Sequence, residues 1–347
     1  MAKTYGARWE VVRSLRPGGQ AETFLVRDQT GALAGEYVLK RVRNPDRHDR
    51  FRVEIESLGK LTHPNVVRLI DSSITSEPYY LVTEYCQAGS LEDSSGHWAT
   101  DPVAALRLVA QVCDGLTAAH AAGILHRDIK PANIGLRTPT GPPVLLDFGI
   151  AYVADGERLT LTDEAVGARR FTAPELADGR ADVVSARADV YSIGKLVYWL
   201  LNGGRVFDRE QHRDQHYDLA RRDGGDPRLE HVNRLLDNMI TLEVSRRYAD
   251  AGAAAGAVRK VAEMLAQDVR VLDADLPQRC AFCSVGEYAT VQLGDPTAVS
   301  NFGLKPVATS DWRALVCQNC GNVQLFRPDR TEKRRWWGGS GTVRPVG

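Results

Sequence analysis

The chain has 347 residues, 43% of them hydrophobic and 25% charged, which are ordinary values for a globular protein and exclude a wholly disordered chain. Because 44 basic residues balance 44 acidic ones, net charge provides no general attraction to nucleic acid or to an anionic membrane. The chain has no apolar run long enough to span a membrane and no apolar leader segment, so we expect a cytoplasmic protein without membrane insertion.

The N-terminal part of the chain predicts strands and one helix. Four short runs have strand character, namely 24–27, 36–40, 66–70 and 79–82. Residues 28–31 (DQTG) predict a hairpin turn. Residues 50–61 carry apolar side chains at helical spacing, which predicts a helix between the second and third strands.

From residue 101 onward the pattern becomes helical. Asp101 and Pro102 are typical of a helix N-terminus, and Gly123 is typical of the C-terminus of the same helix. Residues 189–201 and 232–242 predict two further apolar helices. A β-rich part followed by a helical part indicates an α+β protein with two lobes around a cleft.

Four sequence blocks carry the strongest functional signal. Upstream lies VLK (38–40) at the end of a predicted strand, and downstream lie HRDIKPAN (126–133), DFG (147–149) and APE (173–175). In this order the blocks resemble the signature of the eukaryotic-like serine/threonine protein kinase family of bacteria, over residues 9–264. The resemblance implies a bilobal protein kinase fold, with a β-rich N-lobe, a helical C-lobe and ATP as the phosphoryl donor.

Phosphoryl transfer depends on positioning and on neutralising phosphate charge, and the motif residues suit both tasks. The resemblance implies that Asp128 orients the acceptor hydroxyl and takes its proton, while Lys130 contacts the γ-phosphate. Asn133 and Asp147 carry the oxygen ligands that Mg²⁺ (or Mn²⁺) prefers. These four residues form the predicted catalytic and magnesium-binding set.

The resemblance also implies how the other lobe holds the nucleotide. Lys40 would hold the α- and β-phosphates, with Glu54 of the predicted helix as its partner. Glu56 lies on a different face of that helix and is the weaker choice. The segment from Glu84 to Cys86 would form a hinge whose backbone groups read adenine, and the Cys86 thiol is interpreted as a packing group.

Several further residues are implied as supports of the site. His126 would pack rather than catalyse, and Arg127 would sense the state of the activation segment. Glu175 would pair with Arg247 in the late helical part of the chain. Asp189 resembles the structural aspartate that hydrogen-bonds the catalytic loop in the family.

The glycine-rich loop departs from the family pattern. Only its central glycine is kept, as Gly18, whereas Arg16 and Ala21 occupy the other two glycine positions. Glycine lets the backbone approach phosphates closely, so the loss of two glycines should weaken nucleotide affinity. We expect binding, with Gly18 as a contact, to persist because Lys40, Asn133 and Asp147 remain. A second departure is Ala168 after Gly167, where the family carries a threonine that ties the substrate loop to the catalytic residues.

Two threonines lie between the DFG and APE blocks, Thr160 and Thr162. A phosphate on either would pair with Arg127 and order the activation segment. They are equally interpretable as loop threonines without a regulatory role, and both interpretations stay open.

Two C-x-x-C pairs near the C-terminus form the second strong signal, Cys280 with Cys283 and Cys317 with Cys320. Four thiolates of this pattern wrap one tetrahedral Zn²⁺ in structural sites, and the unit resembles a zinc ribbon. The alternatives are a redox dithiol and unpaired thiols. Because the unit has few apolar residues for a core, we favour structural zinc.

The tail after residue 327 is rich in Arg and Lys and contains Trp336 and Trp337. Basic residues beside aromatic ones bind nucleic acid by phosphate contact and stacking. The same residues would equally dock on a protein, pack on the kinase lobe or stay solvated, so nucleic acid is not the partner that we expect. We expect ATP, a protein substrate of unknown identity, and a protein docked on the zinc unit or the tail.

The chain therefore divides into parts of different character. They are an N-terminal extension (1–8), a protein kinase domain (9–265, with an N-lobe at 9–86 and a C-lobe at 87–265), a linker (266–279), a zinc-ribbon-like β domain (280–326) and a basic flexible tail (327–347).

The predicted function is that of a protein serine/threonine kinase, which transfers the γ-phosphate of ATP to serine or threonine hydroxyls and autophosphorylates. One alternative is a pseudokinase, an interaction protein with weak nucleotide binding, which the altered glycine-rich loop favours. Another is a small-molecule kinase of related fold, which the APE block disfavours. The complete set of motif residues favours the active enzyme.

Overall fold

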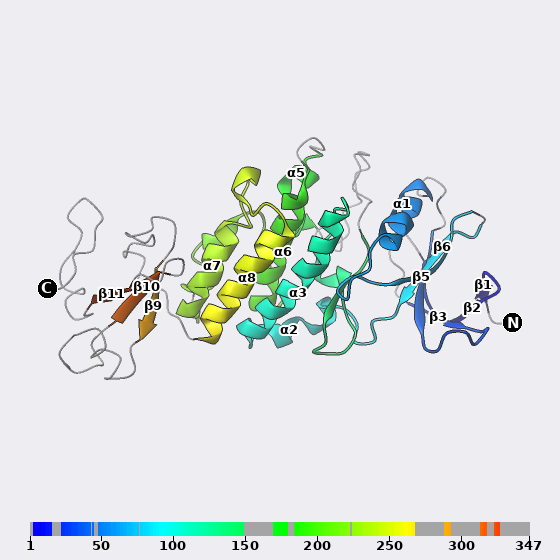
Figure 1. Ribbon diagram of the computed structural model, residues 1–347, viewed down its shortest axis with the longest axis horizontal. Helices are drawn as coiled ribbons and strands as arrows, with labels where there is room; N and C mark the ends of the chain where they lie inside the picture. The colour runs from blue at the N-terminus through cyan, green and yellow to red at the C-terminus, as the bar shows by residue number, and fades with distance from the viewer. Residues whose placement is uncertain are drawn as a thin grey trace. The chain divides into compact units, whose positions relative to one another are not determined.

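The computed structural model describes residues 3–15, 22–42, 44, 48–75, 77–148, 169–179, 184–222, 224–267, 288–292, 313–317 and 323–326. The chain divides into two compact units. One unit contains a six-stranded sheet and most of the helices, and the other contains a three-stranded sheet (Figure 1).

The N-terminal sheet is antiparallel, with the strand order β1-β2-β3-β4-β6-β5. Its strands are β1 (Thr4–Tyr5), β2 (Trp9–Ser14), β3 (Glu22–Asp28), β4 (Tyr37–Arg41), β5 (Leu69–Ser73) and β6 (Tyr80–Glu84). Trp9, Val26, Leu39 and Val82 are fully buried and form one cluster, to which Tyr5 of the edge strand also belongs. Burial of this one face fixes the register of the strands, and the sheet begins before residue 9.

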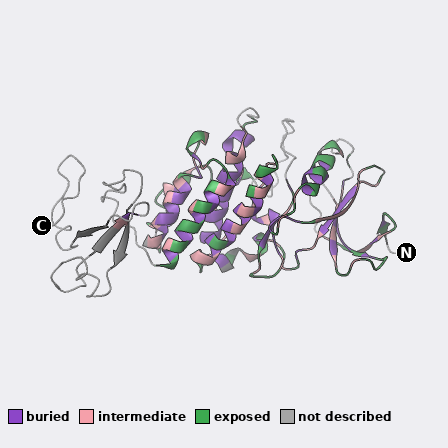
Figure 2. Cartoon of the chain, viewed as in Figure 1, coloured by how far each residue is buried: buried purple, intermediate pink, exposed green. Residues whose placement is uncertain are grey.

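Helix α1 (His48–Gly59) packs on β5 and has two unlike sides. Phe51, Ile55 and Leu58 recur at helical spacing and are buried, whereas the other side of the helix is exposed (Figure 2). The predicted helix at 50–61 is therefore confirmed, with its observed bounds two residues earlier at each end.

The strand predicted at 66–70 is wrong in position. Strand β5 pairs with β6 over Leu69–Ser73, a more polar segment. Val66 instead forms a parallel bridge with Leu145, and the Val67 N–H donates to the Leu145 carbonyl at 3.0 Å. The apolar run at 66–67 reflects burial against the large lobe rather than membership of the sheet.

The helical part contains short and long helices. They are α2 (Ser95–Trp98), α3 (Pro102–Ala121), α5 (Pro174–Ala177), α6 (Ala186–Leu201), α7 (Glu230–Asp237) and α8 (Ala251–Ala266). The Asp101 carboxylate caps α3 by accepting the Ala104 N–H at 2.9 Å, and Gly123 follows the helix with φ +74°. The predicted start and end of α3 are thus confirmed, and α3 packs against α6 (Figure 1).

Helix α6 is buried over the whole of 188–201. Gly194 allows a close approach there, because a Cβ at this position would lie 2.7 Å from Ile240 Cγ1 and 2.8 Å from Met239 Cβ. These two residues follow α7, which ends at Asp237 and not at 242 as predicted. Their burial continues the apolar pattern after the helix has ended, which explains the wrong boundary.

Two smaller sheets complete the described fold. Strands β7 (Ile134–Leu136) and β8 (Pro143–Leu145) form an antiparallel hairpin directly after a 3₁₀ turn at Pro131–Asn133. In the second unit, β9 (Tyr288–Gln292), β10 (Arg313–Cys317) and β11 (Val323–Phe326) form an antiparallel sheet in the order β11-β10-β9. In the described parts of the chain, no helix combines the length and the apolar character that crossing a membrane requires.

Candidate active site

Lys40 is the centre of a set of charged contacts. Its Nζ lies 2.8 Å from Oε1 of Glu54 and 3.1 Å from Oδ1 of Asp147, a residue 107 positions away in the sequence. Strand β4 carries Lys40 between β3 and β6, and Glu54 comes from the buried side of α1. Glu56 is exposed on the same helix, so the predicted contact of Lys40 with Glu54 rather than Glu56 is present.

The charges of this set stabilise one another. Burial alone would lower the pKa of Lys40, but the charges of Asp147 and Glu54 outweigh it and raise the pKa. The Lys40 charge holds the pKa of Asp147 below its usual range. Burial raises the pKa of Glu54, and the opposing effect of Lys40 is smaller. Lys40 and Asp147 therefore present a fixed cation and a fixed anion at neutral pH.

A second set of contacts lies in the loop at 126–133. Oδ2 of Asp128 accepts hydrogen bonds from Lys130 Nζ and from Asn133 Nδ2, both at 2.8 Å. Asn133 Nδ2 also donates to the Asp128 carbonyl at 2.8 Å, which leaves the amide oxygen of Asn133 for another partner. The Asp128 and Lys130 side chains are 30% and 25% exposed, so a second molecule can reach them.

Asp189, in the first turn of α6, holds this loop in place. Its carboxylate accepts the backbone N–H groups of His126 at 2.9 Å and Arg127 at 2.7 Å, and His120 Nε2 lies 2.9 Å away. Burial alone would raise the pKa of Asp189, but these hydrogen bonds lower it. Arg127 and Asp147 adopt φ angles of 63° and 44°, which are strained for residues other than glycine. The backbone is therefore strained both in the loop at 126–133 and at Asp147. The predicted supporting role of Asp189 is confirmed.

His126 is a packing residue, as predicted. It is fully buried, and its ring centroid lies 4.7 Å from that of Phe148. Its Nε2 lies 2.8 Å from the Leu146 carbonyl, and its Nδ1 accepts the Asp128 N–H at 3.3 Å, which defines a neutral ring protonated at Nε2. Burial lowers the pKa of His126 and outweighs the nearby carboxylates.

The predicted pairing of Glu175 with Arg247 is confirmed. Arg247 Nη1 lies 2.6 Å from Oε1 of Glu175 and Nη2 lies 3.1 Å from Oε2, and both side chains are at most 1% exposed. Arg247 also donates to the carbonyls of Thr241 and Arg187. The buried charges are therefore matched by hydrogen bonds, which a buried ion pair requires.

The predicted hinge begins at Glu84, the last residue of β6. Cys86 is 7% exposed, and burial raises its pKa to about 11, so its thiol packs and is not reactive. Gly135 of β7 makes room for it, because a Cβ there would lie 2.8 Å from Cys86 Sγ. The Glu84 carboxylate accepts two hydrogen bonds from the Arg137 guanidinium.

Other predicted residues lie outside the described ranges. They are Arg16, Gly18, Ala21, Gly149, Thr160, Thr162, Gly167, Ala168, Cys280, Cys283 and Cys320, together with most of the linker and the tail. Of the four predicted zinc ligands only Cys317 is described, at the end of β10. Among the described residues, no group of His, Cys, Asp and Glu side chains would hold a metal ion by itself.

Three residues of this region were not predicted from the sequence. His120 contacts Asp189, Arg137 contacts Glu84, and Lys195 of α6 is fully buried. Lys195 carries a signal that could have been used, since it is the one charged residue in the apolar run 190–201. Arg137 follows a three-residue strand and belongs to no motif block, so nothing in the sequence marks it.

Comparison with known proteins agrees with this geometry. The protein kinase domain family matches residues 9–258. The serine/threonine-protein kinase PkaA of Streptomyces coelicolor is 38% identical over 207 residues, which are 58% of this chain and 37% of PkaA. PknB of Mycobacterium tuberculosis is 32% identical over 289 residues, 78% of this chain and 44% of PknB. PrkC of Bacillus subtilis is 32% identical over 216 residues, 60% of this chain and 33% of PrkC.

These relatives are described as serine/threonine-protein kinases, and this chain spans less than half of their length. The family match covers most of the chain and includes every kinase motif residue described above. The chain belongs to the protein kinase domain family.

Proposed function

We propose that this chain is an active kinase that transfers the γ-phosphate of ATP to serine or threonine hydroxyls of proteins. The observation that carries the proposal is the contact of Lys40 with both Glu54 and Asp147. The three residues come from three separate segments of the chain. Phosphoryl transfer requires positioning and charge neutralisation, and this contact supplies both. The described activity of the relatives supports the same acceptor class.

Each side chain of the loop at 126–133 has a role in this proposal. The Asp128 carboxylate would orient the acceptor hydroxyl and accept its proton. Lys130, 2.8 Å away, would offset the negative charge that builds up on the transferred group. Asn133 holds the Asp128 carboxylate through its amide nitrogen.

The donor set also fits a divalent cation. The Asp147 carboxylate is more than half exposed and charged, and the Asn133 amide oxygen is turned away from Asp128. Hard oxygen ligands of this kind suit Mg²⁺, which would neutralise the phosphate oxygens of ATP when bound. Lys40, whose Nζ lies 3.1 Å from Oδ1 of Asp147, would contact the α- and β-phosphates.

Autophosphorylation with Mg-ATP tests the proposal. We expect the purified chain to gain phosphate by intact mass, and we expect Asp128→Asn and Lys40→Met to gain none. Lys60→Met, which removes an exposed lysine just after α1, should behave like the wild type. Nucleotide binding without phosphorylation of the chain or of any added protein would instead favour the pseudokinase alternative.

Regulation through the activation segment is a further part of the proposal. Arg127 Nε is buried and has no hydrogen-bond partner within the described parts of the chain. An unpaired buried guanidinium nitrogen is costly, and a phosphate on Thr160 or Thr162 would satisfy it. Site mapping of the phosphorylated chain should therefore find phosphate on these threonines, and Arg127→Gln should remove its activating effect.

We also propose that the second unit binds one structural Zn²⁺ through its four cysteines and serves to dock a partner. Cys317 ends β10 and pairs with Tyr288, the first residue of β9. Cys283 precedes Tyr288 by five positions, and Cys320 precedes the start of β11 by three. The described strands thus begin or end at the same end of this sheet next to each C-x-x-C pair in the sequence, which supports a shared tetrahedral site.

Metal analysis of the purified chain tests the zinc site. We expect about one Zn per chain and its loss after Cys280→Ser with Cys283→Ser. Cys113→Ala is the matched control, because Cys113 is buried inside α3 and far outside the proposed set in the sequence. Full zinc content in the double variant would contradict the site.

A further inference from the structure

Arg137, directly after β7, contacts two segments that lead to the proposed nucleotide site. Its Nε lies 2.9 Å from Oε2 of Glu84 and its Nη2 lies 2.8 Å from Oε1, which makes a bidentate pair. Its Nη1 donates to the Pro64 carbonyl at 2.7 Å. The Glu84 carboxylate also accepts the backbone N–H of Arg68 at 3.0 Å. One guanidinium thus fastens the hinge to the loop that follows α1.

The Glu84 carboxylate is held as an anion by this contact. The side chains of Glu84 and Arg137 are 18% and 32% exposed, so water replaces their mutual contact poorly. Burial alone would raise the pKa of Glu84, but the hydrogen bonds from Arg137 and Arg68 lower it. Two parallel charge-assisted hydrogen bonds fix the geometry of a pair as well as stabilising it.

Strand β7 connects Arg137 to the catalytic loop. The strand begins directly after Asn133 and ends at Leu136, directly before Arg137. The Leu136 N–H donates to the Gly89 carbonyl at 2.9 Å, and its carbonyl accepts the Ala88 N–H at 3.1 Å. Ala88 and Gly89, which lie just after the hinge in the sequence, are therefore hydrogen-bonded to β7, the strand that begins after the proposed magnesium ligand Asn133. Arg137, at the end of this strand, adds a contact with Glu84.

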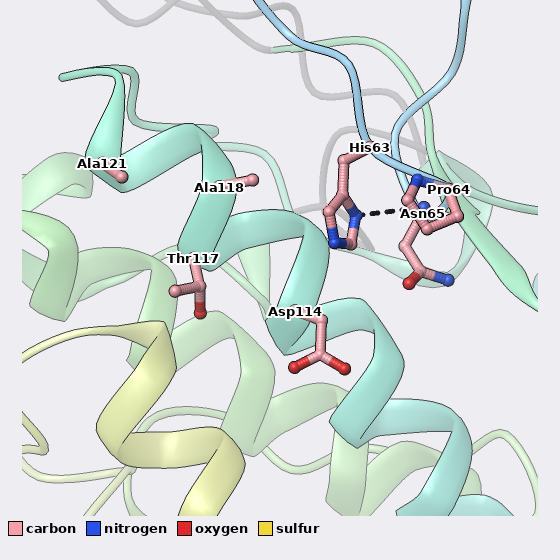
Figure 3. Close-up of a pocket in the computed structure, with 7 residues that line it drawn as sticks. All are labelled: His63, Pro64, Asn65, Asp114, Thr117, Ala118 and Ala121. Carbon is pink, nitrogen blue, oxygen red and sulfur yellow. Dashed lines mark hydrogen bonds between the residues drawn. The ribbon is translucent and has the colours of Figure 1, made fainter.

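The other contact of Arg137 reaches the loop at 63–65. This loop forms one wall of a cavity of about 510 Å³ whose other wall is α3 (Figure 3). His63 Nδ1 accepts the Asn65 N–H at 3.1 Å, and Asn65 Nδ2 donates to the Pro143 carbonyl at 2.8 Å. The loop is thus folded on itself and tied to the β7–β8 hairpin. It also follows α1, the helix that places Glu54 against Lys40.

We propose that Arg137 is a positioning residue for nucleotide binding, which holds the hinge at Glu84 and the loop after α1 in a single arrangement. The inference rests on the proposed function, because it takes the hinge backbone as the adenine contact. Arg137 contacts these supports and none of the residues assigned to the transfer step. Its loss should weaken nucleotide binding and leave the chemical step nearly unchanged.

Two measurements on the full chain test the inference: the Kd for ADP by calorimetry, and the dependence of the autophosphorylation rate on ATP concentration. Arg137→Gln should raise the Kd for ADP and the KM for ATP about five- to thirty-fold, which corresponds to about 1–2 kcal/mol of binding free energy. The maximal rate should stay within about twofold of the wild type, since transition-state contacts are kept.

Further variants separate positioning from general stability. Arg137→Lys keeps the charge but loses the bidentate geometry, so it should recover only part of the affinity. Glu84→Gln should weaken binding similarly, and the double variant should be no worse than the weaker-binding single one. Arg259→Gln is the matched control, because its Nη2 lies 2.5 and 2.6 Å from the carboxylate oxygens of Asp114, away from the hinge.

The outcomes distinguish the two proposals. Equal ADP affinity in Arg137→Gln and the wild type, or an equal loss in Arg259→Gln, overturns the positioning role, whatever the change in melting temperature. Failure of the wild type to bind ADP overturns it as well. If the wild type binds ADP but phosphorylates nothing, the proposed function is wrong. A difference in ADP affinity between the wild type and Arg137→Gln would still support the role of Arg137.

Discussion

Helices α6 and α1 each supply one carboxylate to the proposed site, but the two helices differ in how far they are buried and in what their carboxylates contact. Helix α6 is buried throughout 188–201, and Asp189 fixes the catalytic loop through the backbone of two residues. Helix α1 buries only one side, and Glu54 reaches the site through its hydrogen bond with Lys40. The catalytic loop is therefore held by a buried helix, whereas the α1 side of the site depends on the contact of Glu54 with Lys40 from a helix that is buried on one side only.

The largest effect should come from breaking the contacts around α6. Arg247→Met leaves the Glu175 carboxylate buried and unpaired, and it removes a hydrogen bond to the Arg187 carbonyl of α6. The free energy of unfolding should fall by about 3–5 kcal/mol in urea titrations. Arg246→Met, one position earlier and exposed, should change it by less than about 0.5 kcal/mol. Equal losses in the two variants would show that the pair does not hold α6 in place.

The second largest effect on stability should come from Lys195, a buried lysine of α6. Its Nζ donates to the carbonyls of Phe207 at 2.8 Å and Arg209 at 2.7 Å, and burial lowers its pKa to about 7. Since the unfolded chain keeps an ordinary lysine pKa near 10.4, it binds more protons than the folded chain above pH 7. Stability should therefore rise with pH, by about 2 kcal/mol from pH 7 to pH 9 relative to Lys195→Met.

Urea titrations at a series of pH values measure this difference. The same comparison with Lys260→Met, which removes an exposed lysine of α8, should be independent of pH. A difference between the wild type and Lys195→Met that stays constant from pH 7 to pH 9 would mean that Lys195 keeps its proton in the folded state.

The smallest effect on stability should come from the α1 side. Glu54→Gln leaves Lys40 paired with Asp147, so the free energy of unfolding should fall by only about 1 kcal/mol. Autophosphorylation should nevertheless fall at least tenfold, because Lys40 loses the contact that orients it. Glu56→Gln should leave both quantities unchanged. A stability loss in Glu54→Gln as large as that of Arg247→Met would remove the contrast between the two helices.

The contacts of Glu54 and Arg247 could be predicted because the resemblance to the kinase family implies both, and helical spacing favours Glu54 over Glu56. The positions of β5 and the end of α7 could not be predicted in the same way. At 66–67 and 239–240 apolar residues are buried by tertiary contacts outside a strand or a helix, so local hydrophobicity misplaces the boundary. Local patterns report burial, but they do not report which partner buries a residue.

The residues that support the site indirectly were the least predictable. Arg137 acts on Glu84, which is 53 positions away, and no local pattern encodes a partner at that distance. Lys195 interrupts an apolar run, but only the fold shows that two backbone carbonyls accept hydrogen bonds from its Nζ. Roles that depend on one long-range contact become visible only when the chain is folded.

Strand β1 lies at the edge of the N-terminal sheet and precedes residue 9, where the family match starts. Thr4 and Tyr5 pair with β2, and the Tyr5 ring lies 5.7 Å from that of Phe24 and 6.0 Å from that of Tyr80. A protein shortened to start at residue 9, where the family match starts, would keep every catalytic motif but uncover the hydrogen-bonding edge of β2. Open strand edges recruit strands from other molecules, so the shortened protein should aggregate more readily than the full chain.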